Sequence, residues 1–333
     1  RIIKKKNPEA VRAANVEHTA SVLEVARQVG VRRFIYVSSF HALDPRRETP
    51  YAVSKREAEA VVRGTEGLDT AVLVLPAVHG SRWSGALSAL NALPDPIARA
   101  LFGALKALKP TVSARRVAQA AVELAATGRP GEVRLCADDL GRNPVYRVFR
   151  GTVDLGFVAV TGVALSWLVL LSWVAVRTTS RGPGFHVQER VGAGESPFRL
   201  VKLRTMTVGT PQRGTHEVSA AAITPVGRLL RSTKLDELPQ AWNVVRRELS
   251  VVGPRPCLPS QTELLAERRA AGVFAIRPGI TGLAQVNGID MSDARRLAEW
   301  DQRYMHMRSI LLDLRIVAAT ALGRGFGDPA GRG

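Results

Sequence analysis

Hydrophobic and polar positions in the first part of the chain alternate between the period of helices and that of short buried strands. A helical pattern begins near Pro8, where proline is well tolerated in a first turn, and stops at Gly30. Two apolar runs, Phe34–Val37 and Ala71–Leu75, have the length of buried strands, and another helix opens at Tyr51. Strands that alternate with helices in this way predict an α/β domain in which helices cover a parallel sheet.

The middle of the chain contains a long apolar run without a charged residue, from Leu155 to Val176. At 1.5 Å per residue a helix of this length spans about 33 Å, which is enough for the hydrocarbon core of a bilayer. Arginines flank both ends of the run, so the distribution of positive charge does not assign an orientation. We therefore predict a membrane helix, with a buried core helix as the less favoured alternative.

Beyond this run the pattern predicts a second domain of helices and short strands. Phe198–Leu203 is typical of a strand or an interfacial segment, and the period of two places Lys202 and Arg204 on one face. Three further segments follow: a loop rich in Gly, Thr and Ser at 207–222, a short helix at Ile223–Arg231 and an amphipathic helical stretch at Leu297–Leu322.

The predicted organisation has four parts. They are an α/β domain at 1–140, a linker at 141–150, a membrane helix at 151–181 and an α+β, mostly helical domain at 182–325.

Composition narrows the classes of partner. The 333 residues carry a net charge of +18, which suits a partner rich in phosphate. The sequence contains no nucleic-acid module and no basic helix with interleaved aromatic residues, so we expect anionic lipid or a nucleotide and no nucleic acid. The two cysteines, Cys136 and Cys257, lie far apart and are expected to be free thiols in a reducing compartment. The chain does not begin with Met, and we expect further residues upstream.

Two adjacent carboxylates, Asp236 and Glu237, lie between Arg231 and Arg255 in the second domain. Mg²⁺ binds carboxylate and phosphate oxygens, and arginines stabilise the charge of a phosphate. An acidic pair between cations therefore suits a divalent metal and a phosphorylated substrate.

The residues before this acidic pair predict its local structure. We expect Ser232 and Thr233 to cap a helix that holds the pair in its first turn, with Pro239 near the start. Exposed N–H groups at such a helix start favour anions, including a phosphate in transit. Adjacent residues of a helix point about 100° apart, so the two carboxylates can serve one site in different roles.

Three strings of residues surround the acidic pair. They are Leu-Asp-Glu-Leu-Pro-Gln-Ala-Trp-Asn-Val at 235–244, Gly-Pro-Arg-Pro at 253–256 and Arg-Pro-Gly-Ile-Thr-Gly-Leu-Ala-Gln-Val-Asn-Gly at 277–288. With these strings the chain resembles the monotopic phosphoglycosyl transferases, a family of bacterial sugar transferases, over roughly 147–322. The resemblance implies a monotopic membrane domain whose hydrophobic helix breaks at Ser-Pro and re-enters. This chain has Ser166-Trp167 at that point, so a re-entrant helix and a spanning helix both stay open.

The resemblance also implies a covalent mechanism. Asp236 would attack the sugar-bearing phosphate of a UDP-sugar with loss of UMP, and a polyprenyl phosphate would then take the phosphosugar from the aspartate. Glu237 would assist with Mg²⁺ and with the proton, and both carboxylates would be metal ligands. The remaining site residues are expected in two groups, with Arg231, Arg255, Lys202 and Arg204 at the substrate phosphates and Gln285 and Asn287 on the nucleotide side.

The first domain carries Tyr51-x-x-x-Lys55, the string Val-Arg-Arg-Phe-Ile-Tyr-Val-Ser-Ser at 31–39 and the pair Asn15-Val16. In these residues it resembles the short-chain dehydrogenase/reductase superfamily, which implies a truncated Rossmann-like domain. The possible remnant dehydrogenase site is Ser39 (or Ser38), Tyr51 and Lys55. In the family Tyr exchanges a proton with the substrate, Lys lowers the pKa of that Tyr, and Ser holds the substrate oxygen. The Gly-rich dinucleotide loop is absent from this sequence, so we expect no tight binding of NAD(P).

The implied function is transfer of a sugar 1-phosphate from a UDP-sugar to undecaprenyl phosphate, at the start of exopolysaccharide or glycan assembly. The expected location is the bacterial inner membrane, in contact with the lipid bilayer, with the catalytic domain on the cytoplasmic face. Two alternatives remain: an NAD-dependent sugar-nucleotide epimerase/dehydratase or oxidoreductase anchored by the second half, and a non-catalytic scaffold that binds sugar nucleotides. The sequence leaves the transferred sugar and a possible homodimer open.

Overall fold

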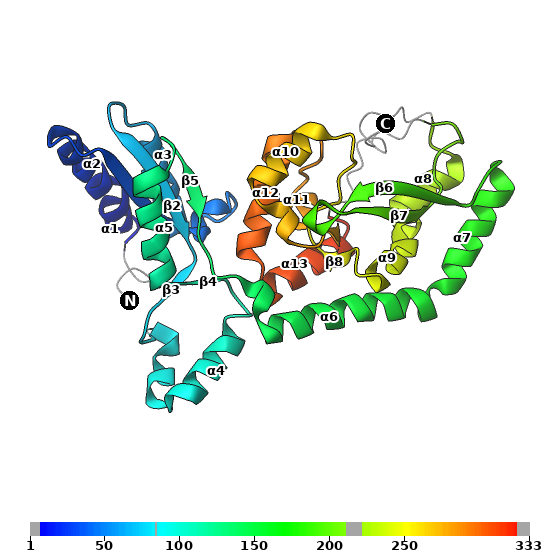
Figure 1. The fold of residues 1–333 in the computed structure, drawn as a ribbon, viewed down its shortest axis with the longest axis horizontal. Coiled ribbons are helices and arrows are strands. Elements are labelled where there is room, and N and C mark those ends of the chain that lie inside the picture. Colours follow the sequence, from blue (N-terminus) through cyan, green and yellow to red (C-terminus); the bar gives the residue numbers. More distant parts are fainter. Residues whose placement is uncertain (1–6, 84, 211–221, 325–333) are drawn as a thin grey trace. The chain divides into compact units, whose positions relative to one another are not determined.

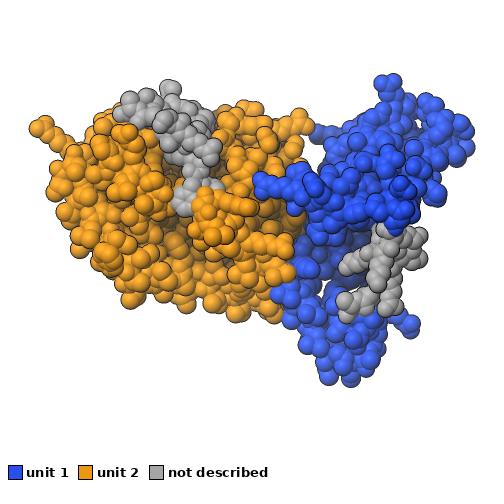
Figure 2. Space-filling model, turned by 180° about the vertical axis from the view of Figure 1, so that it is seen from behind, with its two compact units in different colours: residues 1–143 blue, residues 144–333 orange. Residues whose placement is uncertain are grey.

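The computed structural model describes residues 7–83, 85–210 and 222–324. The chain divides into two compact units, residues 1–143 and 144–333, which Figure 2 draws in different colours. Each unit has strands and a buried core of its own. Most of the predicted loop at 207–222, and the last residue of the predicted domain 182–325, lie outside the described residues.

Unit 1 alternates helices and strands in chain order (Figure 1). Its helices are α1 (Pro8–Arg12), α2 (His18–Gln28), α3 (Pro50–Arg63), α4 (Asp95–Leu105) and α5 (Ala114–Thr127). Its strands are β1 (Arg33–Ser39), β2 (Asp69–Leu75), β3 (Ala77–His79), β4 (Thr111–Ser113) and β5 (Val133–Leu135).

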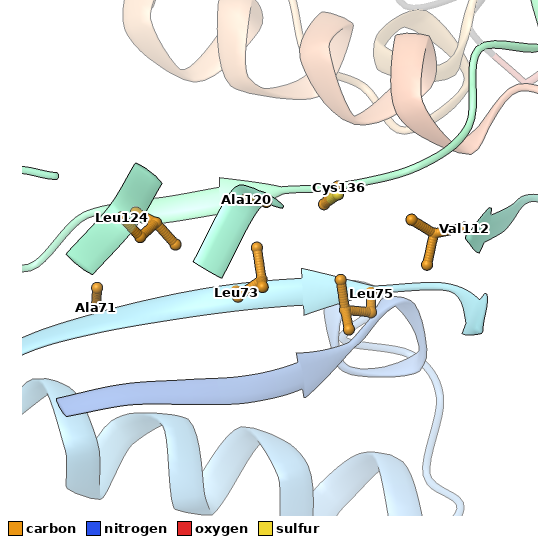
Figure 3. Close-up of a cluster of buried hydrophobic side chains, with 7 residues drawn as sticks. All are labelled: Ala71, Leu73, Leu75, Val112, Ala120, Leu124 and Cys136. Atoms are coloured by element: carbon orange, nitrogen blue, oxygen red, sulfur yellow. The ribbon is translucent and has the colours of Figure 1, made fainter. Parts of the chain in front are cut away.

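The main sheet of unit 1 is parallel, as the pattern predicts. Its strand order is β1-β2-β5, and β3 pairs in parallel with β4 in a second sheet. Alternate residues of β2 point toward α5, where Leu73 packs with Ala120 and Leu124 in the cluster that Figure 3 shows. The expected burial of the first strand is confirmed only in part, since Val37 is 46% exposed. The reason is that β1 is an edge strand of the sheet.

The predicted first helix is a helix with one irregular turn. Asn7 caps α1 by accepting a hydrogen bond from the N–H of Glu9, and a π-helical turn at Ala13–Glu17 joins α1 to α2. Gly30 adopts a φ of +69°, a left-handed conformation that glycine reaches without strain and that ends the helix. The start and the end of this helix therefore follow the sequence signals.

Unit 2 is mostly helical, with two short pairs of strands. Its helices are α6 (Pro144–Ala159), α7 (Ser166–Thr179), α8 (Pro225–Thr233), α9 (Ala241–Val245), α10 (Thr262–Ala270), α11 (Leu283–Val286), α12 (Ala294–Met307) and α13 (Ile310–Ala321). Its strands are β6 (Phe185–Val191), β7 (Pro197–Leu203), β8 (Ser250–Val252) and β9 (Gly279–Thr281). The strands β6 and β7 form an antiparallel hairpin, and β8 and β9 pair in parallel.

The long apolar run is bent by 63° between residues 144–164 and residues 166–179, at the position of the predicted break (Figure 1). A π-helical turn precedes Leu165, whose φ of −111° and ψ of 2° leave the helical region. The indole N–H of Trp167 donates to the carbonyl of Ala164 at 2.8 Å, so a side chain takes a carbonyl that the helix can no longer pair. A straight helix across this run is therefore not the form of this structure, although no proline causes the break.

No single helix of the described residues combines the length and apolar character needed to cross a membrane, whereas the two halves of the bent pair meet that requirement when taken together. The first half begins at Pro144, inside the stretch that the sequence pattern indicated as a linker.

Polar side chains on one face of α6 dock it onto the rest of unit 2. The carboxylate of Asp154 accepts from the hydroxyl of Ser250 and from the N–H of Val251, both at 2.8 Å. The hydroxyl of Tyr146 donates to Asp313 on α13 at 2.7 Å. The amphipathic stretch at 297–322 forms α12 and α13, because Ser309 caps a second helix there. These contacts join the bent pair to α13 and to β8, the strand that precedes the turn with Arg255.

Candidate active site

The acidic pair lies in a short 3₁₀ helix, Leu235–Gln240 (η9), directly after α8. Lys234 adopts a left-handed φ of 59° between the two helices and stops α8. The predicted capping by Ser232 and Thr233 is wrong, because both hydroxyls donate back to the carbonyl of Leu229, at 2.9 and 2.8 Å, inside the last turn of α8. The pair nevertheless occupies the first turn of its helix, as predicted.

Glu237 lies between two cations from separate elements. The ammonium of Lys202 on β7 donates to its Oε1 at 3.1 Å, and a guanidinium nitrogen of Arg255 lies 3.8 Å from the same oxygen. The side chain of Glu237 is only 13% exposed, so water screens these charges little. Burial alone would raise the pKa of Glu237, but Lys202 and Arg255 outweigh it and lower that pKa to about 2.

Asp236 has the opposite electrostatic character. Its residue is 7% exposed, and its Oδ1 has no hydrogen-bond partner among the described residues. Burial, followed by the charge of Glu237, raises the pKa of Asp236 to about 6. A buried carboxylate oxygen without a partner is uncommon, because its desolvation is not compensated. This oxygen is therefore well suited to meet a ligand or a reacting atom.

Two close backbone approaches lock the strings around the site together. A Cβ on Gly279 would lie 2.1 Å from the backbone nitrogen of Gly253, so only glycine fits there. The N–H of Gly253 donates to the carbonyl of Thr281 at 2.8 Å. The string with Arg255 and the string that begins at Arg277 are thus held as one piece.

The other two predicted phosphate-binding residues differ in their placement. Arg231 donates from Nε to the hydroxyl of Thr205 at 2.9 Å, and its charge lowers the pKa of Asp236 in opposition to burial. Arg204 instead donates to the carbonyl and the hydroxyl of Ser180, at 3.0 and 2.8 Å, where α7 ends. The structure therefore gives Arg204 a role in holding the end of the bent pair.

Both predicted nucleotide-side amides point donors back into their own loop. Gln285 donates to the carbonyl of Ile280 at 3.2 Å, and Asn287 donates to the carbonyl of Leu283 at 2.8 Å. The Oε1 of Gln285 is buried without a hydrogen-bond partner among the described residues. The acceptor side of that amide is thus the part with capacity for a ligand.

Two buried arginines behind the Pro-Arg-Pro turn were not among the predicted site residues. Arg190 on β6 is 8% exposed and Arg268 on α10 is 2% exposed. The signal in the sequence is a charge where the pattern asks for an apolar residue, since Arg268 shares the buried face of α10 with Leu264, four positions earlier.

The possible dehydrogenase residues of unit 1 lie at the end of β1 and at the start of α3, and they contact residues of β1, of the turn after it and of α3. The hydroxyl of Ser39 accepts from the N–H of His41 at 3.3 Å, and Lys55 donates to the carbonyl of Val37 at 3.1 Å. The ring of Tyr51 packs edge-on to His41, with 6.0 Å between the ring centroids. The alternative Ser38 donates to Glu59 at 3.1 Å.

The acidic pair of unit 2 fits a Mg²⁺ ion whose other ligands come from the substrate phosphates and water. The described residues contain no group of three or more His, Cys, Asp or Glu that would hold a metal by themselves. Mg²⁺ is commonly bound through one or two carboxylates plus substrate phosphates, with water in the remaining positions. Asp236, whose Oδ1 has no partner among the residues described, and the adjacent Glu237 provide that donor set.

Comparison with known proteins divides the chain in the same way. A family profile described as bacterial sugar transferase matches residues 145–324, and one described as NAD dependent epimerase/dehydratase family matches residues 4–133.

Curated relatives resemble the second half of the chain. A UDP-glucose:undecaprenyl-phosphate glucose-1-phosphate transferase of Klebsiella pneumoniae is 36% identical over 196 residues, which are 55% of this chain and 41% of that protein. A protein of the same name from Caulobacter vibrioides is 36% identical and covers 50% of this chain and 66% of its own length. The uncharacterized sugar transferase EpsL of Bacillus subtilis is 36% identical, covering 52% and 84%. The chain thus spans less than two thirds of the length of the relatives from Klebsiella pneumoniae and Caulobacter vibrioides.

Among solved structures, RMD from Pseudomonas aeruginosa complexed with NADPH is 20% identical, with a TM-score of 0.34, and the match covers 46% of this chain and 60% of that one. A likeness of this size says nothing about function, and the fold of unit 1 rests on its own parallel sheet.

Proposed function

The chain belongs to the bacterial sugar transferase family, and from this premise we propose that it transfers a sugar 1-phosphate from a UDP-sugar to undecaprenyl phosphate. The observation that supports this most is the contrast within the acidic pair. Asp236 is buried, and its Oδ1 has no partner in the part of the chain that the structure describes, while Glu237 beside it is held by Lys202 and Arg255. The carboxylate of Asp236 is thus available to react, and the cations that pair with Glu237 lie beside it.

In the first step a carboxylate oxygen of Asp236 attacks the phosphorus that carries the sugar. A bond forms between that oxygen and phosphorus, the bond from phosphorus to the bridging oxygen breaks, and UMP leaves with the electron pair. Arg255 and Lys202 stand 3.8 and 3.1 Å from Glu237 and bring positive charge to the region where negative charge develops on the phosphate oxygens.

In the second step an oxygen of undecaprenyl phosphate attacks the same phosphorus. The bond to Asp236 breaks, the carboxylate returns to its starting state, and the product is an undecaprenyl diphosphate sugar. Splitting the transfer in this way replaces one direct displacement between two large anions by two displacements at phosphorus. The fixed carboxylate is the nucleophile in the first and the leaving group in the second.

When bound, Mg²⁺ would supply positive charge to the diphosphate of the donor, with Asp236 and Glu237 as its protein ligands. Glu237 is ionised well below neutral pH, because Lys202 and Arg255 lower its pKa to about 2. It is therefore ionised at neutral pH, as a carboxylate ligand of Mg²⁺ must be.

We place the bent pair α6–α7 at the cytoplasmic face of the bacterial inner membrane. This placement is supported by a set of apolar side chains on the pair that are exposed. With their exposed fractions, they include Val148 (70%), Leu155 (69%), Val163 (81%), Trp167 (57%) and Leu170 (60%). Exposed apolar surface of this extent is costly in water and favourable in a bilayer. A helix pair that bends by 63° can enter and leave on one side, which would keep the acidic site at the surface where its lipid acceptor lies.

The test is UMP release by the detergent-solubilised full chain, with undecaprenyl phosphate and a panel of UDP-sugars that includes UDP-glucose and UDP-N-acetylgalactosamine. We expect release by the wild type with at least one donor and none above background by Asp236→Asn. Without the lipid acceptor, mass spectrometry should find a phosphosugar on Asp236. A wild type that releases no UMP from any donor would contradict the proposal.

A further inference from the structure

The turn that carries Arg255 is held at four consecutive backbone carbonyls, from Pro254 to Cys257. The carbonyl of Pro254 accepts from the N–H of Gly279 at 2.8 Å, and that of Cys257 accepts from the N–H of Val191 at 3.0 Å. The two carbonyls between them accept from side chains. Arg268 Nη1 donates to the carbonyl of Arg255 at 2.8 Å, and Arg190 Nη1 donates to that of Pro256 at 2.9 Å.

Each of the two buried arginines makes a second contact in addition to the one with the turn. Arg268 donates from Nε and Nη2 to one oxygen of Asp301 on α12, at 3.0 and 2.7 Å, and both side chains are 2% exposed. Arg190 also donates to the side-chain oxygen of Gln188 at 2.6 Å. Each guanidinium therefore has a second partner that fixes its plane before it reaches the turn.

Buried guanidinium groups are a costly way to build a core. Replacing a buried ion pair by well-packed apolar residues is often neutral or stabilising, because the charges lose their hydration. Stability alone thus gives little reason for two such groups behind one turn. What they supply, and an apolar residue cannot, is a direction for the carbonyls of residues 255 and 256.

That direction matters because the side chain of Arg255 is the part of the turn that meets the acidic pair. Its guanidinium lies 3.8 Å from Glu237 and would face the transferred phosphate. Pro254 and Pro256 restrict φ on either side of it, and the four carbonyl contacts fix what remains of the backbone freedom.

We propose that Arg190 and Arg268 are positioning residues for the transfer reaction, which hold the Arg255 turn so that its guanidinium stands ready for the phosphate. Neither touches the substrate, and both act through Arg255. The inference rests on the proposed function, since it assigns these residues to the same reaction.

The experiment measures UMP release from UDP-glucose, or from the donor on which the wild type is most active, by the detergent-solubilised full chain. Arg268→Lys keeps the charge opposite Asp301 but removes the second arm that reaches the carbonyl of Arg255. We expect kcat to fall about 10- to 100-fold while KM changes less than about threefold, because a misplaced catalytic group costs rate more than ground-state binding. Arg190→Lys should act in the same direction.

Arg269→Lys is the matched control. Arg269 is the next residue on α10, its side chain is 60% exposed, and it pairs with Glu195 at the surface. The same chemical change there should leave kcat within about twofold of the wild type.

A double-mutant cycle separates positioning from general damage. In an Arg255→Ala background, Arg268→Lys should slow UMP release by no more than about threefold, because the group through which it acts has gone. If Arg268→Lys instead lowered kcat by the same factor with and without Arg255, its effect would be structural and the inference would be overturned.

The remaining outcomes are also decisive. If Arg268→Lys does not give folded protein by circular dichroism, Arg190→Lys takes its place in the same cycle, since it addresses the neighbouring carbonyl. An active wild type with unchanged kcat in both lysine variants overturns the inference and leaves the proposed function standing. A wild type that releases no UMP from any UDP-sugar overturns the proposed function and the inference with it.

Discussion

Both units of this chain carry a set of residues that resembles a catalytic motif, but the two sets use their charges differently. In unit 1 the ammonium of Lys55 donates to a backbone carbonyl of β1, and Ser39 accepts from a backbone N–H just beyond that strand. In unit 2 charged side chains from β7 and from the turn after β8 converge on one carboxylate of the acidic pair. The other carboxylate of the pair keeps an oxygen without a partner among the described residues.

This difference shows what a spacing motif does and does not indicate. A Tyr and a Lys four residues apart share a helix face whether or not they meet a substrate. In unit 1 Lys55 and Ser39 hydrogen-bond to nearby backbone groups, whereas in unit 2 buried opposite charges are kept together at a desolvation cost. The epimerase-like profile matches residues 4–133, and the acidic pair of unit 2 has the stronger electrostatic support for chemistry.

The largest expected effect is the loss of the carboxylate of Asp236. Asp236→Asn should lower UMP release by at least about 10³-fold, because an amide cannot act as the nucleophile. Tyr51→Phe, the matched removal of one polar group from the motif of unit 1, should leave UMP release within about twofold. A comparable loss in the Tyr51 variant would erase the contrast between the two units.

Next in size is the difference between buried and exposed ion pairs. Asp301→Asn should reduce the free energy of opening of unit 2 by about 3 kcal/mol, because Arg268 would stay buried with a neutral partner. Arg99→Gln in unit 1 removes a surface pair, whose side chains are 73% and 79% exposed, and should cost less than about 0.5 kcal/mol. Hydrogen exchange of the amides in α12 and α4 would measure both, and equal losses would contradict this account of where charge is kept.

Local sequence signals explain most of the elements and few of the contacts. The start at Asn7-Pro8, the end at Gly30 and the buried strand β2 depend on residues within a few positions of one another, and these were predicted. The capping by Ser232 and Thr233 was wrong, because Lys234 turned left-handed and closed α8 first.

The contacts that form the site join residues far apart in the chain, which no local pattern encodes. The partners Lys202 and Glu237 are separated by 35 positions and Arg190 and Pro256 by 66. Of the cations predicted to bind the substrate phosphates, Lys202 and Arg255 lie beside Glu237, while Arg204, two residues beyond Lys202, donates to Ser180 at the end of α7. Alternation along a strand assigns a face, and the element packed on that face decides the partner.

The pH profile of UMP release should report the raised pKa of Asp236 beside Glu237. Burial and Glu237 raise the pKa of Asp236 to about 6, and the reactive form is the carboxylate, so the active fraction grows as the pH rises. We expect the rate to rise about tenfold per pH unit below about pH 6 and to level off above it. Glu237→Gln removes the neighbouring charge and should move this limb to lower pH. A wild-type limb near pH 4, typical of an exposed aspartate, would show that the pair does not interact in this way.

The smallest expected effect comes from one substitution made in both units. Lys55→Met removes the hydrogen bond to the carbonyl of Val37 and the cation–π contact with the ring of Tyr36, 4.8 Å away. It should cost unit 1 about 1 kcal/mol, because the apolar stem of the side chain is retained. UMP release should then stay within about twofold of the wild type. Lys202→Met makes the same change beside Glu237, which is left with Arg255 at 3.8 Å, and should slow UMP release about tenfold or more. Because the two lysines differ chiefly in what their ammonium groups face, equal rates for the two variants would mean that the charge on Lys202 serves only the fold, as that on Lys55 does.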